Sequence, residues 1–175
     1  VVYQYEQHPD GSSCFPFASE GLRHIYGVAP EAVKHDASSV FEVIHPDDLP
    51  SVAKTITESA EKGVDWICEY RVIHSGKTRW VFGHARPQSG IDESTLWYGM
   101  IIDITERKNL ELELEKSQAN LKLAQRIART GHWEANMESG ELYWSDMVYE
   151  ILGYQPSELK PSVEFFRSLV PEKDM

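Results

Sequence analysis

The sequence predicts an α+β fold: one five-stranded antiparallel sheet with short helices on one face, then a long amphipathic helix and a partial second unit. Three observations predict it. The order of patterns is two strands, several short helices and three further strands. Residues 105–130 contain neither glycine nor proline. The pattern of the first residues then returns, incomplete, near the carboxyl end.

The composition limits the classes of function. The chain has 175 residues, of which 41% are hydrophobic, enough for one or two small cores. Its net charge of −11 opposes binding to nucleic acid, and no run is long and apolar enough for a membrane segment. No secretory signal is visible. We therefore expect a cytoplasmic fragment, although the parent protein could be membrane-associated.

The amino-terminal residues have the pattern of two strands and a short helix. Aromatic-rich strands are predicted at residues 1–7 and 14–17, around a turn that contains Gly11. Ser19 is a candidate cap for a short helix that ends at Gly27.

A longer helix is predicted at residues 48–62, directly after His45-Pro46-Asp47. Its apolar residues lie along one face, and Gly63 is a natural terminator. A histidine beside carboxylates also suggests a metal or acid–base site. Proline and acidic residues in a first helical turn explain the same motif through helix geometry and the helix dipole, and we favour that explanation.

Three consecutive strands are predicted at residues 66–73, 78–86 and 96–104. The first alternates apolar and polar side chains, as a half-buried antiparallel strand does. Ser75-Gly76 is a two-residue hairpin signal between the first two strands. Residues 87–94 are polar and are predicted to form a loop.

Residues 105–130 are predicted to form a linker helix. Asp103 and Thr105 stand where side-chain oxygens cap a first turn. Apolar and small residues recur at alternating steps of four and three, which is a heptad seam: Leu110, Leu114, Ser117, Leu121, Ala124 and Ala128. The seam indicates a dimeric coiled coil through Leu110, Leu114 and Leu121, or an amphipathic helix lying on its own domain. We favour the dimer.

Two stretches of the chain match in the same order of residue types. The matching segments are Ser19-Glu20, Ile25-Tyr26-Gly27 and Pro30-Glu31, against Ser145-Asp146, Ile151-Leu152-Gly153 and Pro156-Ser157. The match indicates a duplicated unit, of which the second copy is incomplete. We therefore expect a domain at 1–104, a linker helix at 105–130 and the first part of a second domain at 131–175.

Taken in order, these motifs resemble a PAS sensory domain of the common bacterial type with its PAC motif. The segments that carry the resemblance are Ile25-Tyr26-Gly27, Ile44-His45-Pro46-Asp47-Asp48, Glu69-Tyr70-Arg71, Arg79-Trp80-Val81, Asp103-Ile104-Thr105-Glu106-Arg107 and Gly131-His132-Trp133-Glu134. The resemblance covers essentially the whole chain: one PAS domain, a linker helix and the first half of a second PAS domain.

The resemblance implies a non-catalytic sensory and dimerisation module of a signal-transduction protein. In this family the output domain is most often a sensor histidine kinase of a two-component system, or a cyclic-dinucleotide enzyme such as a diguanylate cyclase. Asp103 and Thr105 would then transmit the signal from sheet to helix; an ordinary helix cap is the compatible alternative. The sequence has no nucleophile elbow, phosphate loop or HExxH helix, so we assign no catalytic residue.

The space between sheet and helices is the best candidate ligand pocket, and a filled core without a ligand is the alternative. The predicted lining and polar anchors are Phe17, His24, Ile25, Tyr26, Val43, Val52, Ile56, Tyr70, Val72, Trp80, Phe82 and His84. Walls of this kind would suit a small, largely apolar molecule.

Cofactors are constrained by what the resemblance requires. Haem-binding members carry a ligating histidine on the long helix, and residues 48–62 contain none. Light-sensing flavin members place a cysteine in an Asn-Cys-Arg motif, which neither Cys14 nor Cys68 has. A non-covalent flavin, giving a redox or light sensor, stays open as the alternative function. Neither the cysteines nor the histidines show metal-ligand spacing, so no metal site is expected.

Overall fold

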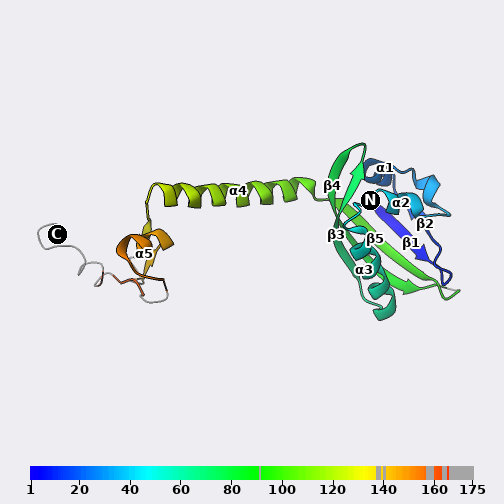
Figure 1. The fold of residues 1–175 in the computed structure, drawn as a ribbon. Coiled ribbons are helices and arrows are strands. Elements are labelled where there is room, and N and C mark those ends of the chain that lie inside the picture. Colours follow the sequence, from blue (N-terminus) through cyan, green and yellow to red (C-terminus); the bar gives the residue numbers. More distant parts are fainter. Residues whose placement is uncertain (91, 137–138, 140, 157–159, 163–164, 166–175) are drawn as a thin grey trace, which may run out of the picture. The chain divides into compact units, whose positions relative to one another are not determined.

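The structure is a computed structural model that describes residues 1–175 except 91, 137–138, 140, 157–159, 163–164 and 166–175. The chain divides into two compact units, Val1–Glu111 and Leu112–Met175 (Figure 1). Residues 166–175 of the predicted second domain lie outside the described residues.

The first unit is built on a five-stranded antiparallel sheet, which confirms the predicted fold class. The strands lie in the order β2-β1-β5-β4-β3, so the first strand of the chain lies beside the last strand of the sheet. Their bounds are β1 Val2–Gln7, β2 Ser13–Ala18, β3 Trp66–His74, β4 Lys77–Ser89 and β5 Thr95–Asp103. The β3–β4 turn is the predicted one, with positive φ at Ser75 and Gly76, as a type I′ hairpin requires.

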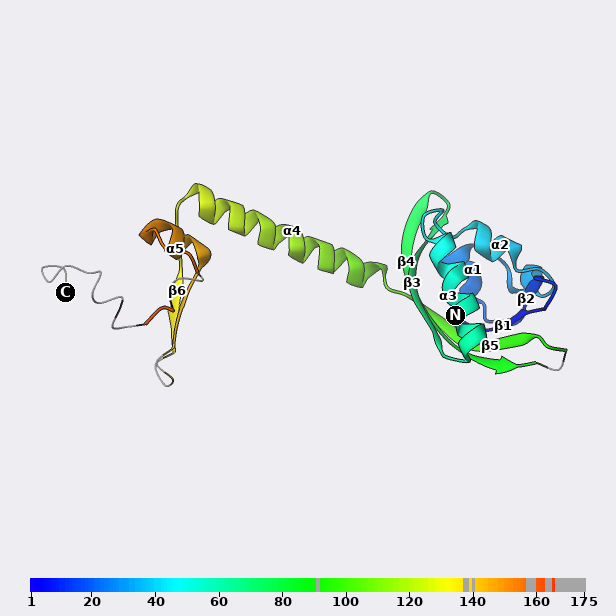
Figure 2. The same ribbon diagram turned by 60° about the horizontal axis from the view of Figure 1, so that its bottom comes forward.

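Short helices cover one face of this sheet (Figure 2). They are α1 Gly21–Tyr26, the 3-10 helix η1 Pro30–Val33, α2 Ser38–Glu42 and α3 Leu49–Lys62. Gly27 and Gly63 end α1 and α3 in the left-handed conformation, with φ of 72° and 63°. The predicted cap at Ser19 is wrong: the helix begins one residue later, and the Ser19 hydroxyl accepts a hydrogen bond from the Val2 N–H at 3.0 Å.

Successive side chains of each strand point to opposite faces of the sheet, and those on the face toward the helices form the core. Tyr3 and Tyr5 of β1, Val81 and Ala85 of β4, and Trp97 of β5 all face the helices and are buried. Their neighbours along each strand face the other way. Several of these are large, apolar and at least one-third exposed: Val2, Ile67, Tyr98, Met100 and Ile102.

The free edge of β3 is covered by the segment that precedes α3. Ile44 bridges to Val72, and the His45 N–H donates to the Arg71 carbonyl at 2.9 Å. Asp48 then accepts three hydrogen bonds from Arg71, from its backbone N–H at 2.8 Å and its guanidinium at 2.9 and 2.6 Å. The acidic motif therefore ties the start of α3 to the sheet, which covers an edge that would otherwise invite pairing with another chain.

Strand β4 is longer than predicted. The segment 87–94 was expected to be a loop, but β4 continues to Ser89 and pairs Pro87 with Trp97. Proline is tolerated there because β3 ends its pairing at Ala85, which leaves Pro87 with a strand on one side only.

The long helix α4 spans Thr105–Ile127 and has no buried residue. In the second unit, β6 Trp133–Ala135 pairs antiparallel with β7 Leu142–Trp144, and α5 Asp146–Leu152 follows. Among the described residues, no helix combines the length and apolar character that crossing a membrane would need.

Replacing Asp48 by Asn should lower the free energy of unfolding at neutral pH by about 2 kcal/mol, because charge-assisted bonds to Arg71 are lost. Arg71 holds the pKa of Asp48 below its ordinary value. A lowered folded-state pKa stabilises the fold above the unfolded pKa, about 3.9 for aspartate. The difference between wild type and variant should therefore persist above that pH and shrink as the pH falls through the lower, folded-state pKa. Urea unfolding across pH measures this, with Asp92→Asn as control; a pH-independent difference would contradict it.

Candidate functional site

A pair of buried tyrosines lies at the centre of the space between sheet and helices. The hydroxyl groups of Tyr26 on α1 and Tyr70 on β3 are 2.6 Å apart, so that one donates a hydrogen bond to the other. Burial raises the pKa of both phenols well above the ordinary value, so the pair is neutral at physiological pH. Both tyrosines are among the predicted polar residues of the pocket, and the fold brings their hydroxyl groups together.

The cavity beside this pair is small. It measures about 30 Å³ and is lined by Tyr3, Tyr5, Phe41, Ile56, Trp66 and Trp97. Sites for small-molecule ligands usually enclose about 300–1,000 Å³, whereas this space suits a single water. Both indole N–H groups of the lining are already bonded, from Trp97 to Ser59 and from Trp66 to Thr55, each at 3.0 Å. In this conformation the cavity has no room for a drug-sized ligand.

Seven of the predicted pocket residues belong to the core. Ile25, Tyr26, Val52, Tyr70 and Val72 are buried, and Val43 and Ile56 pack against them: all lie between sheet and helices. Of the seven, Ile56 alone lines the cavity among the described residues. The sequence did not identify the other five lining residues, Tyr3, Tyr5, Phe41, Trp66 and Trp97, although the aromatic alternation of the first strand pointed to the first two.

The placement of the other five pocket residues was wrong. Trp80, Phe82 and His84 alternate with the buried Val81, Gly83 and Ala85, and so lie on the face of β4 away from the helices. His84 there contacts the carboxylate of Asp65 at 2.9 Å. His24 is exposed on α1, and Phe17 is 51% exposed at the end of β2.

A β-bulge explains the position of Phe17. Along β2, Phe17 pairs with Gln4, but Cys14 pairs with Glu6, so three steps on β2 correspond to two on β1. The extra residue reverses the alternation, which leaves Phe15 buried and turns Phe17 to the opposite face.

The junction between the sheet and α4 is built by Asp103, Thr105 and Trp80. The Asp103 carboxylate accepts hydrogen bonds from the Thr105 backbone N–H at 2.9 Å and from the Thr105 hydroxyl at 2.5 Å. The Thr105 hydroxyl oxygen in turn accepts from the Trp80 backbone N–H at 3.0 Å. The last residue of β5, the first residue of α4 and the first part of β4 are thus linked through one hydroxyl group.

Charges on the first turn of α4 strengthen this junction. The Glu69 carboxylate on β3 accepts from Arg107 at 2.5 Å and contacts the Lys108 ammonium at 2.7 Å. Lys108 and Arg107 lower the pKa of Glu69. Two cations lie over the Trp80 ring, Lys108 at 5.3 Å and Arg71 at 5.5 Å from its centre. The start of α4 is therefore attached to both β3 and β4.

These features agree with the comparison with known proteins. A family model described as PAS fold matches residues 15–100. Residues 15–100, which make up most of the first unit, belong to the PAS domain family. The crystal structure of a sensory box histidine kinase/response regulator from Burkholderia thailandensis E264 is 26% identical, with a TM-score of 0.52, and the match covers 69% of this chain and 90% of that one.

Two curated proteins with a similar sequence are also signalling proteins. The methyl sulfide methyltransferase-associated sensor of Methanosarcina acetivorans is 36% identical over 107 residues, and a blue-light-activated histidine kinase of Brucella ovis is 33% identical over 94 residues. The matches cover 58% and 53% of this PAS chain, but 10% and 18% of those proteins. The PAS chain is a sensory module of signal transduction, and it spans a small part of the length of these relatives.

The tyrosine pair should behave as a single energetic unit. Tyr70→Phe leaves the buried Tyr26 hydroxyl without its partner, which should cost about 1–3 kcal/mol of unfolding free energy. The double variant, with Tyr26→Phe added, should lose less than the sum of the two single losses, because no unpaired hydroxyl remains. Chemical denaturation of the four proteins measures the coupling, with the exposed Tyr98→Phe as control. Strictly additive losses would show that the hydroxyls do not depend on each other.

Proposed function

We propose that this chain is a non-catalytic sensory and dimerisation module, and that it relays a signal through α4 to an output domain outside these residues. A sensor histidine kinase is the output that the relatives favour, with a cyclic-dinucleotide enzyme as the alternative. The observation that carries the proposal is the junction at Thr105, where one hydroxyl joins β4, β5 and the first residue of α4.

The junction suits a relay because it leaves little freedom between sheet and helix. A shift of β4 relative to β5 changes the distance between Trp80 and Asp103, and Thr105 bonds to both. The contacts of Glu69 with Arg107 and Lys108 connect a third strand, β3, to the start of α4. Asp103 and Thr105 are accordingly proposed as the signal-transmission residues.

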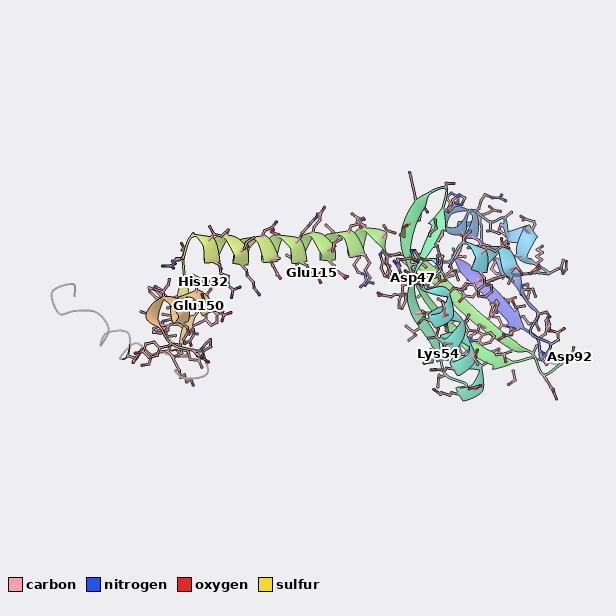
Figure 3. The ribbon with its side chains drawn as sticks, in the orientation of Figure 1. Asp47, Lys54, Asp92, Glu115, His132 and Glu150 are labelled. Carbon is pink, nitrogen blue, oxygen red and sulfur yellow. The ribbon has the colours of Figure 1, made fainter. Side chains whose placement is uncertain are left out.

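The surface of α4 supports association through this helix. Leu110, Leu114 and Leu121 are each about 60% exposed, although they repeat at heptad spacing. Figure 3 shows side chains, Glu115 among them, extending into open space along the helix. A seam of exposed leucines in a helix without buried residues supports a second copy of the chain as partner.

The size of the core cavity favours this function over a flavin sensor. A flavin ring system needs a pocket of several hundred Å³, whereas the cavity measures about 30 Å³. The aromatic core would have to open to admit it. We therefore propose that the signal reaches this domain without a bound chromophore.

Replacing Leu114 by Glu should convert a dimer into a monomer, because it places a charge in the middle of the seam. Leu112→Glu is the matched control: the same substitution, two positions earlier and roughly 200° around the helix, should leave the dimer intact. Native mass spectrometry and light scattering of both variants measure the oligomeric state. A dimer that survives Leu114→Glu, or is lost equally in both, would rule out association through this seam.

Replacing Thr105 by Val should loosen the start of α4 without unfolding the sheet. The variant loses the hydrogen bonds of the hydroxyl with Asp103 and Trp80, worth about 1 kcal/mol together, so amide exchange in residues 105–111 should become roughly fivefold faster. Hydrogen-exchange mass spectrometry measures this, with Thr57→Val on the exposed face of α3 as control. Unchanged exchange at the start of α4 would show that the hydroxyl does not couple sheet and helix.

A further inference from the structure

The β1–β2 hairpin brings together three side chains with different donor atoms: oxygen, nitrogen and sulfur. Glu6 and Cys14 are directly paired across the two strands. His8 lies one residue beyond the end of β1, where the hairpin turn begins. A carboxylate oxygen, an imidazole nitrogen and a thiol sulfur, one from each residue, all lie within 4.8 Å of one another. We call this group the hairpin cluster.

The hairpin cluster is separate from the sensory core. Tyr5, which lies between Gln4 and Glu6 on β1, faces the helices, whereas Glu6 faces the other side of the sheet. Strand β2 is the outermost strand, so solvent reaches the cluster from the edge. In Figure 3 the label Asp92 marks the β4–β5 turn, at the end of the sheet where the hairpin turn also lies.

Neighbouring hydrogen bonds hold the cluster in place. The Ser94 hydroxyl donates to a carboxylate oxygen of Glu6 at 2.8 Å. The His8 backbone N–H donates to the Ser12 carbonyl at 2.9 Å, and the Gly11 backbone N–H donates to the His8 carbonyl at 3.0 Å. The Ser94 bond orients the Glu6 carboxylate, as the partners of ligating carboxylates do, and the two backbone bonds fix the turn that carries His8.

We propose that Glu6, His8 and Cys14 form a Zn²⁺ site, with three protein ligands and one open coordination position. The mixed oxygen, nitrogen and sulfur donors suit zinc and exclude Mg²⁺ and Ca²⁺, which require oxygen ligands. Donors around a tetrahedral zinc are about 3.5 Å apart, so side-chain rotations close the present spacing.

Zinc binding at this site must deprotonate Cys14. Burial and the negative charge of Glu6 raise the pKa of Cys14, so without a cation the thiol keeps its proton. A bound Zn²⁺ reverses the balance: the S–H bond breaks, the Zn–S bond forms, and one proton passes to solvent. No oxidation or reduction is involved. The site is visible only after strand pairing, which is why ligand spacing along the sequence predicts no metal.

Cobalt absorption tests the proposal directly. The untagged chain is titrated with Co²⁺, and a near-ultraviolet thiolate-to-cobalt band should appear and saturate at one equivalent. Zn²⁺ should then displace Co²⁺ and bleach the band. Cys14→Ser should abolish the band, and His8→Ala should weaken Zn²⁺ binding at least tenfold. Cys68→Ser is the matched control, because it removes the other thiol, on β3, and should leave both measurements unchanged.

Each outcome decides the question. A saturable band that depends on Cys14 and His8 but not on Cys68 supports the site. No band in the wild-type chain, or a band that survives Cys14→Ser, overturns it. Circular dichroism establishes that each variant is folded. Should Cys14→Ser unfold, the Zn²⁺ affinity of His8→Ala decides, since an unchanged affinity would also overturn the proposal.

Discussion

The pairing of β1 with β5 is the contact on which the first unit depends. Six consecutive pairs, from Val2 with Met100 to Gln7 with Thr95, join the beginning of the domain to its last strand. This pairing places Tyr5 against Trp97, with ring centres 5.4 Å apart, at the middle of the core. It also fixes the strand from which α4 departs. Without it the sheet would separate into the β1–β2 hairpin, which is too small to be stable alone, and a three-stranded sheet of β3, β4 and β5.

The same pairing divides the functional parts of the domain. One face of the sheet holds the buried tyrosine pair and a cavity large enough for water. The end of β5 holds the junction at Thr105, and the β1–β2 turn at the other end holds the hairpin cluster. One hydrogen-bonded sheet therefore carries all three, and strand register rather than a loop fixes the spacing between them.

The sequence was sufficient for the order of elements and for the helix junction. Period-two alternation, Ser75-Gly76 and the cap residues Asp103 and Thr105 act locally, and local rules describe them well. Whether a β4 residue can line the pocket depends on which face of the sheet its side chain takes. The prediction assigned Trp80, Phe82 and His84 to the face that packs against the helices, whereas they lie on the opposite face. A single bulge reversed the direction of Phe17. Bulges and strand partners are set by tertiary pairing, and short-range patterns do not contain them.

The two attachments of α4 differ in physical character. The Thr105 attachment consists of short hydrogen bonds from a hydroxyl and two backbone N–H groups, whereas Glu69 holds Arg107 and Lys108 mainly by charge. The Arg107 side chain is 50% exposed, and exposed charges are screened over about 8 Å at physiological ionic strength. Rising salt therefore weakens the Glu69 contacts more than the short hydrogen bonds at Thr105. At high ionic strength the start of α4 is therefore held to the sheet mainly by the hydrogen bonds at Thr105.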